Sequence, residues 1–293
     1  MLKFKTVTDE KGCRELWEYF SPKQILWDLW DFRFCFHADN FRFNFIVGLD
    51  GKNETGLLPL VFESKGKYYT YFGEEFPEQN RFLLKDKKNI GLFLEQCPMG
   101  TSIPYISSEE AKYYELKPDE KRYSLGLAKY GNSFENYLKS FTKKHRKNLN
   151  YDLKKLKDAG YASEHNSLKD FERLVELNKL KFGAESNYSS ESFVSGMSKL
   201  IDSALRMGAL DIISIKIGSK VEAVGLGVFY NKVYYVLSSG RNVEIKNLGK
   251  LLIVEEIKSA IANKCSEVDF LSTEANWKEL WNMDSEQMYK FEK

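Results

Sequence analysis

The sequence predicts an α+β protein of two units, each with a mixed, mostly antiparallel sheet flanked by helices. Strand-like segments occur in both halves of the chain, at residues 41–73 and again at 210–240. Between Val224 and Trp281 the order is two strands, a loop, a long helix, a strand and a short last segment. The 293 residues suffice for two domains of ordinary size, and we expect them at 1–125 and 126–293.

Composition narrows the class of protein. Hydrophobic residues make up 43% of the chain and aromatic residues 15%, which is typical of a globular protein. The net charge of +2 is a much weaker basic excess than a dedicated nucleic-acid-binding protein usually shows. The four cysteines are scattered without a CxxC pair, which favours a reducing compartment, and the three histidines lie far apart, so we expect no metal.

The sequence also bears on localisation. The first residues, MLKFKTVTDEKG, are charged and lack a continuous apolar stretch, so no signal peptide is expected. No segment approaches about 18 uninterrupted apolar residues, so no membrane span is expected. We therefore expect a cytoplasmic protein. Its oligomeric state has no signature in the sequence.

The first unit is predicted to begin with helices and to continue with strands. Apolar spacing predicts a helix over 9–20, and an aromatic-rich segment predicts another over 24–38. Three antiparallel strands follow, the first two joined by a hairpin turn, at residues 41–50, 54–64 and 66–73. Residues 85–125 predict a short helix near 88–96 and two strands.

The second unit is predicted to begin with three helices. Asn132 and Glu135 resemble a capping box that opens a helix over 134–158. Two more helices are expected, at 168–183 and 190–208. Strands are then expected at 210–219, 224–231, 232–240 and 267–272, with a helix at 250–264 before the last of them. The two halves show no residue-level repeat.

The loop between the strand 232–240 and the helix 250–264 is a candidate anion site. A glycine-containing turn at a helix N-terminus presents backbone amides to an anion. Lys246 adds a cation, Gly249 allows close approach, and no Ser, Thr, Asp or Asn stands immediately before Lys250 to cap the expected helix. The loop is therefore predicted to hold the pyrophosphate of a nucleotide-bearing cofactor. The alternative is an ordinary strand-to-helix connection with a glycine for packing.

A basic cluster, KKHRKN at residues 143–148, lies in the helix predicted over 134–158. Such a cluster can bind phosphates of a cofactor, a nucleotide sugar or RNA, or it can be a solvated helix face. Arg146 is the candidate substrate-binding residue, because a guanidinium can contact a phosphate with two parallel hydrogen bonds.

Two further groups of residues follow strands of the second unit. Ser238, Ser239 and Gly240 end an apolar strand, and their backbone groups either bind an amide-rich cofactor arm or simply mark the end of the strand. Asp269 lies inside the apolar strand VDFLS, Glu274 comes just after it, and Trp277-Lys278 follows at once. Asp269 and Glu274 are candidates for a general base. The alternative for each of these residues is a purely structural role.

The order of these elements and the loop KNLGKLL resemble the N-acyltransferase (GNAT) superfamily, whose pyrophosphate loop reads Gln/Arg-x-x-Gly-x-Gly/Ala. Lys246 stands at the first position, Gly249 at the glycine, and Leu251 in place of the final small residue. The chain is more closely similar to double-GNAT proteins grouped with cellulose-biosynthesis-type (CelD-like) acetyltransferases and Fem-type aminoacyltransferases. The resembling segments are GLLPLVF, SFTKKHRKNLNYDLKKLKDAG and KLLIVEEIKSAIANKCSEVDFLSTEANWKELW.

This resemblance implies two tandem GNAT-like domains, the first degenerate, and transfer of an acyl group from acyl-CoA, with acetyl-CoA as the first candidate, to an amine. The acceptor would be a small molecule, an amino sugar, a peptide or a cell-envelope precursor. Direct attack by the amine requires no nucleophilic side chain and no metal. Alternatives are a Fem-type enzyme that uses aminoacyl-tRNA, supported by the basic cluster, and a non-catalytic GNAT-fold binding protein.

The resemblance also implies roles for individual residues. Backbone amides of Asn247, Leu248, Gly249, Lys250 and Leu251 would hold the pyrophosphate, with Lys246 nearby. The pantetheine arm would run along the strand 233–239. Amides near Leu237, Ser238 and Ser239, with Lys278, would stabilise the oxyanion. Glu274 or Asp269 would take the ammonium proton, and Trp277-Lys278 occupies the place of an aromatic-Lys pair found in Fem-type enzymes.

Overall fold

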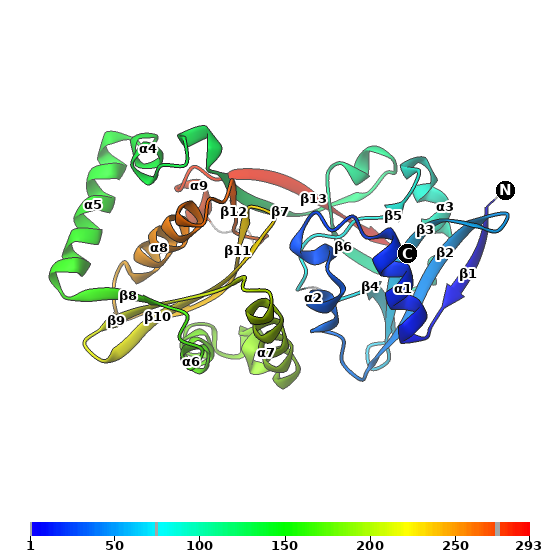
Figure 1. The fold of residues 1–293 in the computed structure, drawn as a ribbon, viewed down its shortest axis with the longest axis horizontal. Coiled ribbons are helices and arrows are strands. Elements are labelled where there is room, and N and C mark those ends of the chain that lie inside the picture. Colours follow the sequence, from blue (N-terminus) through cyan, green and yellow to red (C-terminus); the bar gives the residue numbers. More distant parts are fainter. Residues whose placement is uncertain (1, 74–75, 273–275) are drawn as a thin grey trace. The chain divides into compact units, whose positions relative to one another are not determined.

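The computed structural model describes residues 2–73, 76–272 and 276–293, and it divides into two compact units (Figure 1). Unit 1 comprises Met1–Arg122 together with Glu286–Lys293, and unit 2 comprises Tyr123–Ser285. The sequence predicted a single division after residue 125. In the structure the C-terminal strand belongs with unit 1 instead.

Unit 1 is built on an antiparallel sheet of order β1-β2-β3-β4, with β5 paired to β3, and on a separate pairing of β6 with β13. Its strands are β1 (Lys3–Val7), β2 (Phe41–Asp50), β3 (Asn53–Glu63), β4 (Tyr68–Tyr71), β5 (Leu83–Leu84), β6 (Ser102–Ile106) and β13 (Asp284–Glu292), which begins in unit 2. Its helices are α1 (Glu10–Phe20), α2 (Trp30–Phe34) and α3 (Ile90–Glu95).

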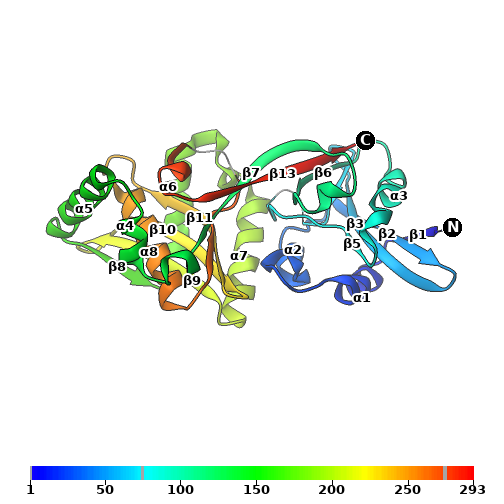
Figure 2. The same cartoon turned by 90° about the horizontal axis from the view of Figure 1, so that it is seen from above.

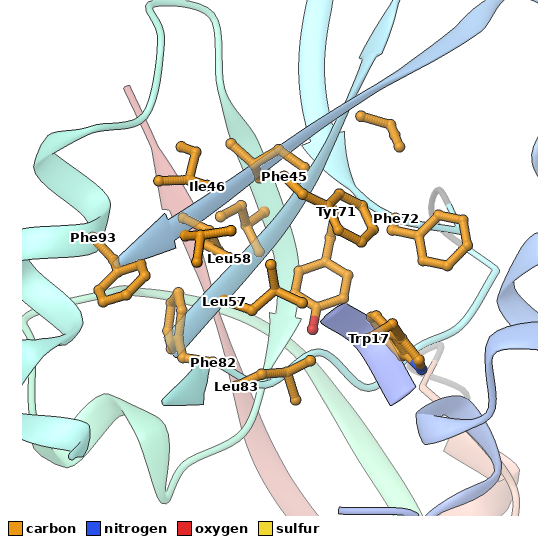
Figure 3. Packing of buried hydrophobic residues seen from close by; sticks show 14 of the residues in the cluster. Trp17, Phe45, Ile46, Leu57, Leu58, Tyr71, Phe72, Phe82, Leu83 and Phe93 are labelled. Carbon is orange, nitrogen blue, oxygen red and sulfur yellow. The ribbon is translucent and has the colours of Figure 1, made fainter. Parts of the chain in front are cut away.

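The core of unit 1 is rich in aromatic side chains that come from several elements (Figure 3). Trp17 of α1, Phe45 of β2, Tyr71 of β4 and Phe93 of α3 are each at most 1% exposed. Burial of a large apolar side chain contributes roughly 1.5–3 kcal/mol, so this cluster is a main source of stability for the unit.

The aromatic-rich helix predicted over 24–38 is wrong for most of its length. The segment forms a 3-10 turn at Leu26–Asp28 and the short helix α2. The buried Asp28 carboxylate accepts hydrogen bonds from the amides of Gln24 (2.8 Å) and Ile25 (3.1 Å), which fixes a turn there. The buried Arg33 guanidinium donates to several backbone carbonyls, among them that of Phe72 (2.8 Å). Tertiary contacts thus override the helical pattern.

Unit 2 contains a sheet of order β7-β12-β11-β10-β9-β8, antiparallel except for the parallel pair β11 and β12. Its strands are β7 (Lys117–Gly126), which begins in unit 1, β8 (Tyr161–His165), β9 (Leu210–Ile217), β10 (Lys220–Tyr230), β11 (Val233–Arg241) and β12 (Glu267–Asp269). Its helices are α4 (Phe134–Lys139), α5 (Lys143–Asp158), α6 (Asp170–Phe182), α7 (Glu191–Arg206), α8 (Leu248–Ala262) and α9 (Asn276–Glu279).

Helices cover both faces of the unit 2 sheet, with α8 on one face and α6 and α7 on the other (Figures 1 and 2). Two glycines show this arrangement, because alternate residues of a strand face opposite sides. A Cβ at Gly225 would lie 2.7 Å from Glu256 Oε1 of α8, and a Cβ at Gly240 would lie 2.4 Å from the Leu174 carbonyl of α6. Val224, the neighbour of Gly225 in β10, pairs with Gly240, so the two glycines face opposite sides.

The single helix predicted over 134–158 is two helices, α4 and α5. Thr142 caps α5 by accepting from the His145 amide (3.2 Å), and Ser140 ends α4. The N-cap of α4 is Ser133, which accepts from the Asn136 amide (3.4 Å), so the capping box assigned to Asn132 is wrong by one residue. Among the residues that the structure describes, no helix combines the length and apolar character of a membrane span.

Candidate active site

Strand β11 carries an irregularity at the residues predicted to meet the cofactor arm. Leu226 pairs with Ser238 and Gly227 pairs with Val236, so Leu237 is an extra residue that forms a β-bulge. The parallel pairing with β12 covers only Val233–Tyr235, and β11 continues to Arg241 beyond it. The second half of β11 therefore presents an edge that β12 does not cover.

The helix that follows begins at Leu248, two residues earlier than the sequence predicted. Its N-cap is Asn247, whose backbone is left-handed (φ 68°) and whose side chain caps no amide. The amides of Lys250 and Leu251 donate to the Asn247 carbonyl (3.0 and 3.1 Å). No described residue accepts a hydrogen bond from the amides of Leu248 or Gly249, so these two amides are available to an external acceptor.

Positive charge gathers at this helix N-terminus, where an anion is favoured by the helix dipole. The Arg241 side chain lies against Gly249, since a Cβ there would be 3.2 Å from Arg241 Nε. Partial burial and the charge of Arg241 lower the pKa of Lys181, which places a second cation nearby. Neither Arg241 nor the exposed Lys246 has an ion-pair partner among the described residues.

Two residues of the predicted pyrophosphate loop are engaged elsewhere. The Lys250 ammonium pairs with Asp152 of α5 (2.6 Å). Leu251 packs against the apolar cluster between α8 and the sheet, which includes Leu156 and Ile213. Its side chain therefore belongs to the core in this structure. The backbone amides of residues 247–249 are what the loop offers to a ligand.

Strand β11 is held from the α6 side next to its bulge. The Tyr188 hydroxyl donates to Ser238 Oγ (2.8 Å), and Asn178 Nδ2 donates to the Ser239 carbonyl (2.8 Å). Asn178 is itself fixed by a hydrogen bond from Ser186 (2.6 Å). Burial raises the pKa of Tyr188, so this hydroxyl stays neutral and keeps its proton for Ser238. Ser238 and Ser239 thus have defined positions.

Asp269 lies beside this region, because it pairs in register with Tyr235 of β11. Its side chain is fully buried, and Oδ1 accepts from the Leu271 amide (2.9 Å). Leu271 has a left-handed backbone (φ 58°), so the Asp269 carboxylate stabilises a tight turn at the end of β12.

Lys278 and Trp277 follow in α9. The Lys278 ammonium is buried and donates to the carbonyls of Phe270 (3.0 Å), Leu271 (3.2 Å) and Ser272. It therefore binds the backbone just beyond β12. The Trp277 side chain is 38% exposed and contacts Phe270 edge to face. The predicted base Glu274 lies outside the described residues.

Arg146 has a partner within its own helical region. Its guanidinium donates to the Lys139 carbonyl at the end of α4 (3.3 Å), which helps to join α4 and α5. The neighbouring basic side chains of Lys143, Lys144 and Lys147 are all exposed. The structure does not bring Arg146 into contact with the loop 246–249.

Sequence reasoning missed Arg241, Tyr188 and Asn178 as site residues. A cation at the last position of an apolar strand, directly before a glycine loop, is a signal that could have pointed to Arg241. Tyr188 and Asn178 carry no local signal, because they lie about 50 to 60 residues from the serines they contact. Among the described residues, no group of three or more His, Cys, Asp or Glu side chains could hold a metal ion.

Part of the chain matches a known family of proteins. Residues 143–279 match the family model of the acetyltransferase (GNAT) domain. A search of curated proteins by sequence finds no match.

The fold of nearly the whole chain recurs in solved structures. FemX matches with a TM-score of 0.65 over 99% of this chain and 96% of its own, at 12% identity. L-PGS from Bacillus licheniformis matches with a TM-score of 0.58 over 96% and 91%, at 12% identity. A tandem GNAT protein from the clavulanic acid biosynthesis pathway matches with a TM-score of 0.57 over 100% and 98%, at 10% identity. The second part of the chain, residues 143–279, is therefore similar to the acetyltransferase (GNAT) domain, and the fold of the chain is similar to those of FemX and of a tandem GNAT protein.

Proposed function

We propose that this protein is an N-acyltransferase that moves an acyl group from acyl-CoA, acetyl-CoA in the first instance, to an amine. One observation carries the proposal. The amides of Leu248 and Gly249 have no acceptor in the described structure, and the Arg241 guanidinium lies beside them. Unsatisfied amides at a helix N-terminus together with an unpaired arginine fit the diphosphate of CoA.

In this proposal strand β11 aligns the acyl donor. The pantetheine arm carries amides, and the edge of β11 beyond Tyr235 offers backbone groups with which such an arm can pair. The bulge at Leu237 changes the direction of the backbone N–H groups at that point. A backbone amide of one of the residues 237–239 would stabilise the oxyanion. Asn178 and Tyr188 would act as positioning residues, because they hold Ser239 and Ser238.

Acyl-CoA supplies a thioester carbonyl that an amine can attack directly, so no covalent intermediate on the protein is required. The incoming amine must lose a proton, and we propose Glu274 or Asp269 as the base, directly or through water. Lys278 would act by holding the backbone of residues 270–272 and, through its charge, by stabilising the oxyanion. Trp277 would offer an exposed aromatic surface to the acceptor. The acceptor is proposed to be a small-molecule, amino-sugar, peptide or cell-envelope precursor amine in the cytoplasm.

Calorimetric titration of CoA into the protein tests the proposal. We expect binding by the unaltered protein and loss of binding in Gly249→Trp, whose indole would displace Arg241 and cover the free amides. Gly126→Trp is the matched control, because a Cβ at Gly126 meets nothing within 4 Å. Pantetheine lacks the diphosphate, so the Gly249→Trp substitution should change its binding affinity far less than that of CoA. Absence of CoA binding to the unaltered protein would refute the proposal.

A second candidate keeps the fold and replaces the donor with aminoacyl-tRNA. The observation that favours it is the basic surface of α5, where Lys143, Lys144 and Lys147 are exposed and form no ion pair with a described residue. Filter binding of tRNA between 50 and 300 mM salt distinguishes the two donors. Salt-sensitive tRNA binding in the absence of CoA binding would favour the second candidate.

A further inference from the structure

A pocket in unit 2 lies at the other end of α8 from the candidate active site. It has a volume of about 490 Å³, which is in the range of small-molecule sites. Its polar lining includes His165, Asp211, Glu255, Lys258, Ser259 and Asn263. Because an α-helix rises about 1.5 Å per residue, the C-terminal turn of α8 is about 20 Å from Gly249. The pocket is therefore separate from the proposed CoA site.

The lining of the pocket contains a buried carboxylate. Asp211, whose side chain is 3% exposed, accepts from His165 Nδ1 (2.9 Å) and from Ser259 Oγ (2.6 Å). No Lys or Arg forms an ion pair with it among the described residues. A buried carboxylate without a Lys or Arg partner among the described residues gives the pocket a negative potential.

Other groups add to this negative potential. Two helices end at the pocket, α7 through Gly208 and α8 through Asn263, and helix C-termini carry partial negative charge. Glu255 supplies a second carboxylate, and the Lys258 ammonium of the lining is already bound to it (2.8 Å). A cation is therefore favoured over an anion.

The lining of the pocket also holds hydrogen-bond acceptors. With Nδ1 of His165 engaged by Asp211, Nε2 has no partner among the described residues, and the His165 side chain is 41% exposed. Asn263 donates through Nδ2 to the Ser259 carbonyl (2.9 Å), which leaves its Oδ1 without a donor in the described structure. These acceptors suit an N–H donor.

The remaining lining selects the class of cation. Leu210 and Phe229 contribute apolar surface. A metal ion is disfavoured, because the described residues place no three His, Cys, Asp or Glu side chains together and both Asp211 oxygens are already hydrogen-bonded. We propose that this pocket binds a primary ammonium group on a short aliphatic chain, at a site distinct from the acyltransfer centre.

The test is titration of n-butylammonium into ¹⁵N-labelled protein at pH 8.5, followed by transverse-relaxation-optimised NMR, with butyrate as the probe of opposite charge. Saturable shifts at the amides of His165, Asn166 and Asn263 are expected with n-butylammonium and not with butyrate. Equal responses to the two probes would overturn the proposal. Shifts confined to residues near Gly249 would also overturn it, because they would report the proposed acyltransferase site instead.

Variants at the rim make the test specific. Asn263→Lys places a cation at the exposed end of α8, and we expect at least a tenfold loss of n-butylammonium affinity. Glu255→Gln should weaken binding about fivefold. Glu185→Gln, an exposed glutamate outside the pocket, is the matched control and should leave affinity unchanged. Unaltered affinity in a folded Asn263→Lys protein would refute the assignment.

Discussion

The Arg241 guanidinium lies against Gly249, where a Cβ would come within 3.2 Å of Arg241 Nε. This contact joins the last residue of β11 to the first turn of α8. Side chains along β11 alternate between the two faces of the sheet. Arg241 pairs with Ala223, so its side chain lies on the face that α8 covers. The strand that would align the acyl donor thus also supplies a cation to the helix that would hold the diphosphate.

The first prediction concerns this arginine. Arg241→Gln should weaken CoA binding about 10- to 100-fold, because a hydrogen bond to a charged group contributes about 1.5–3 kcal/mol. Calorimetry gives the dissociation constants, and urea unfolding should show little change in stability. Lys250→Gln is the control, since Lys250 pairs with Asp152 and its side chain is not offered to the ligand. Equal losses in the two variants would contradict a specific role for Arg241.

The second prediction concerns packing beneath α8. A Cβ at Gly227 would lie 2.4 Å from the ring of the buried Tyr234, so Gly227→Ala should destabilise unit 2 by about 1–3 kcal/mol. Gly126→Ala is the matched change, because a Cβ there meets no atom within 4 Å. Chemical denaturation compares the two variants. Equal midpoints would show that Tyr234 can move aside without cost.

The third prediction separates structure from chemistry at Lys278. Lys278→Met removes the ammonium that binds the carbonyls of Phe270, Leu271 and Ser272, and should lower the free energy of unfolding by about 2–5 kcal/mol. Lys199→Met, an exposed position on α7, should have almost no effect. Urea unfolding measures both. A Lys278→Met protein of full stability that has lost acyl transfer would instead assign the ammonium to catalysis alone.

The fourth prediction is a pH dependence of stability. Glu256 is 2% exposed, and burial together with the charge of Asp211 raises its pKa well above the ordinary value of 4.5. Above pH 4.5 the unfolded chain releases this proton while the folded protein keeps it, so stability falls as pH rises, by up to about 1.4 kcal/mol per unit. This contribution is complete below pH 4.5 and is lost on the way to the folded pKa.

Glu256→Gln removes that titration and should become increasingly more stable than the unaltered protein from pH 5 to pH 9. Urea unfolding at pH 5, 7 and 9 measures the difference. Glu185→Gln, an exposed position, serves as the control and should follow the unaltered protein. A constant difference between Glu256→Gln and the unaltered protein at all three pH values would contradict a protonated Glu256.

Local patterns predicted much of unit 2. The strand, loop, helix and strand around Gly249 appear in that order, because hydrophobic periodicity and turn residues act over short distances. The same patterns misplaced element ends. The helix predicted over 134–158 is interrupted because the Thr142 side chain caps a new helix. The segment 24–38 is irregular because Asp28 accepts a hydrogen bond from the Gln24 amide and Arg33 donates one to the Phe72 carbonyl.

The sequence by itself determined the α+β class, the resemblance to the GNAT superfamily and the position of the glycine loop. These depend on residue types and spacings within short windows. Tertiary structure alone decided that Arg241 lies on Gly249, that Leu237 is a bulge and that Lys278 binds the backbone beyond β12. It also decided that His165, Asp211 and Ser259 meet at one pocket. Each of these relationships is set by strand register or by packing between distant segments, and neither leaves a local pattern in the chain.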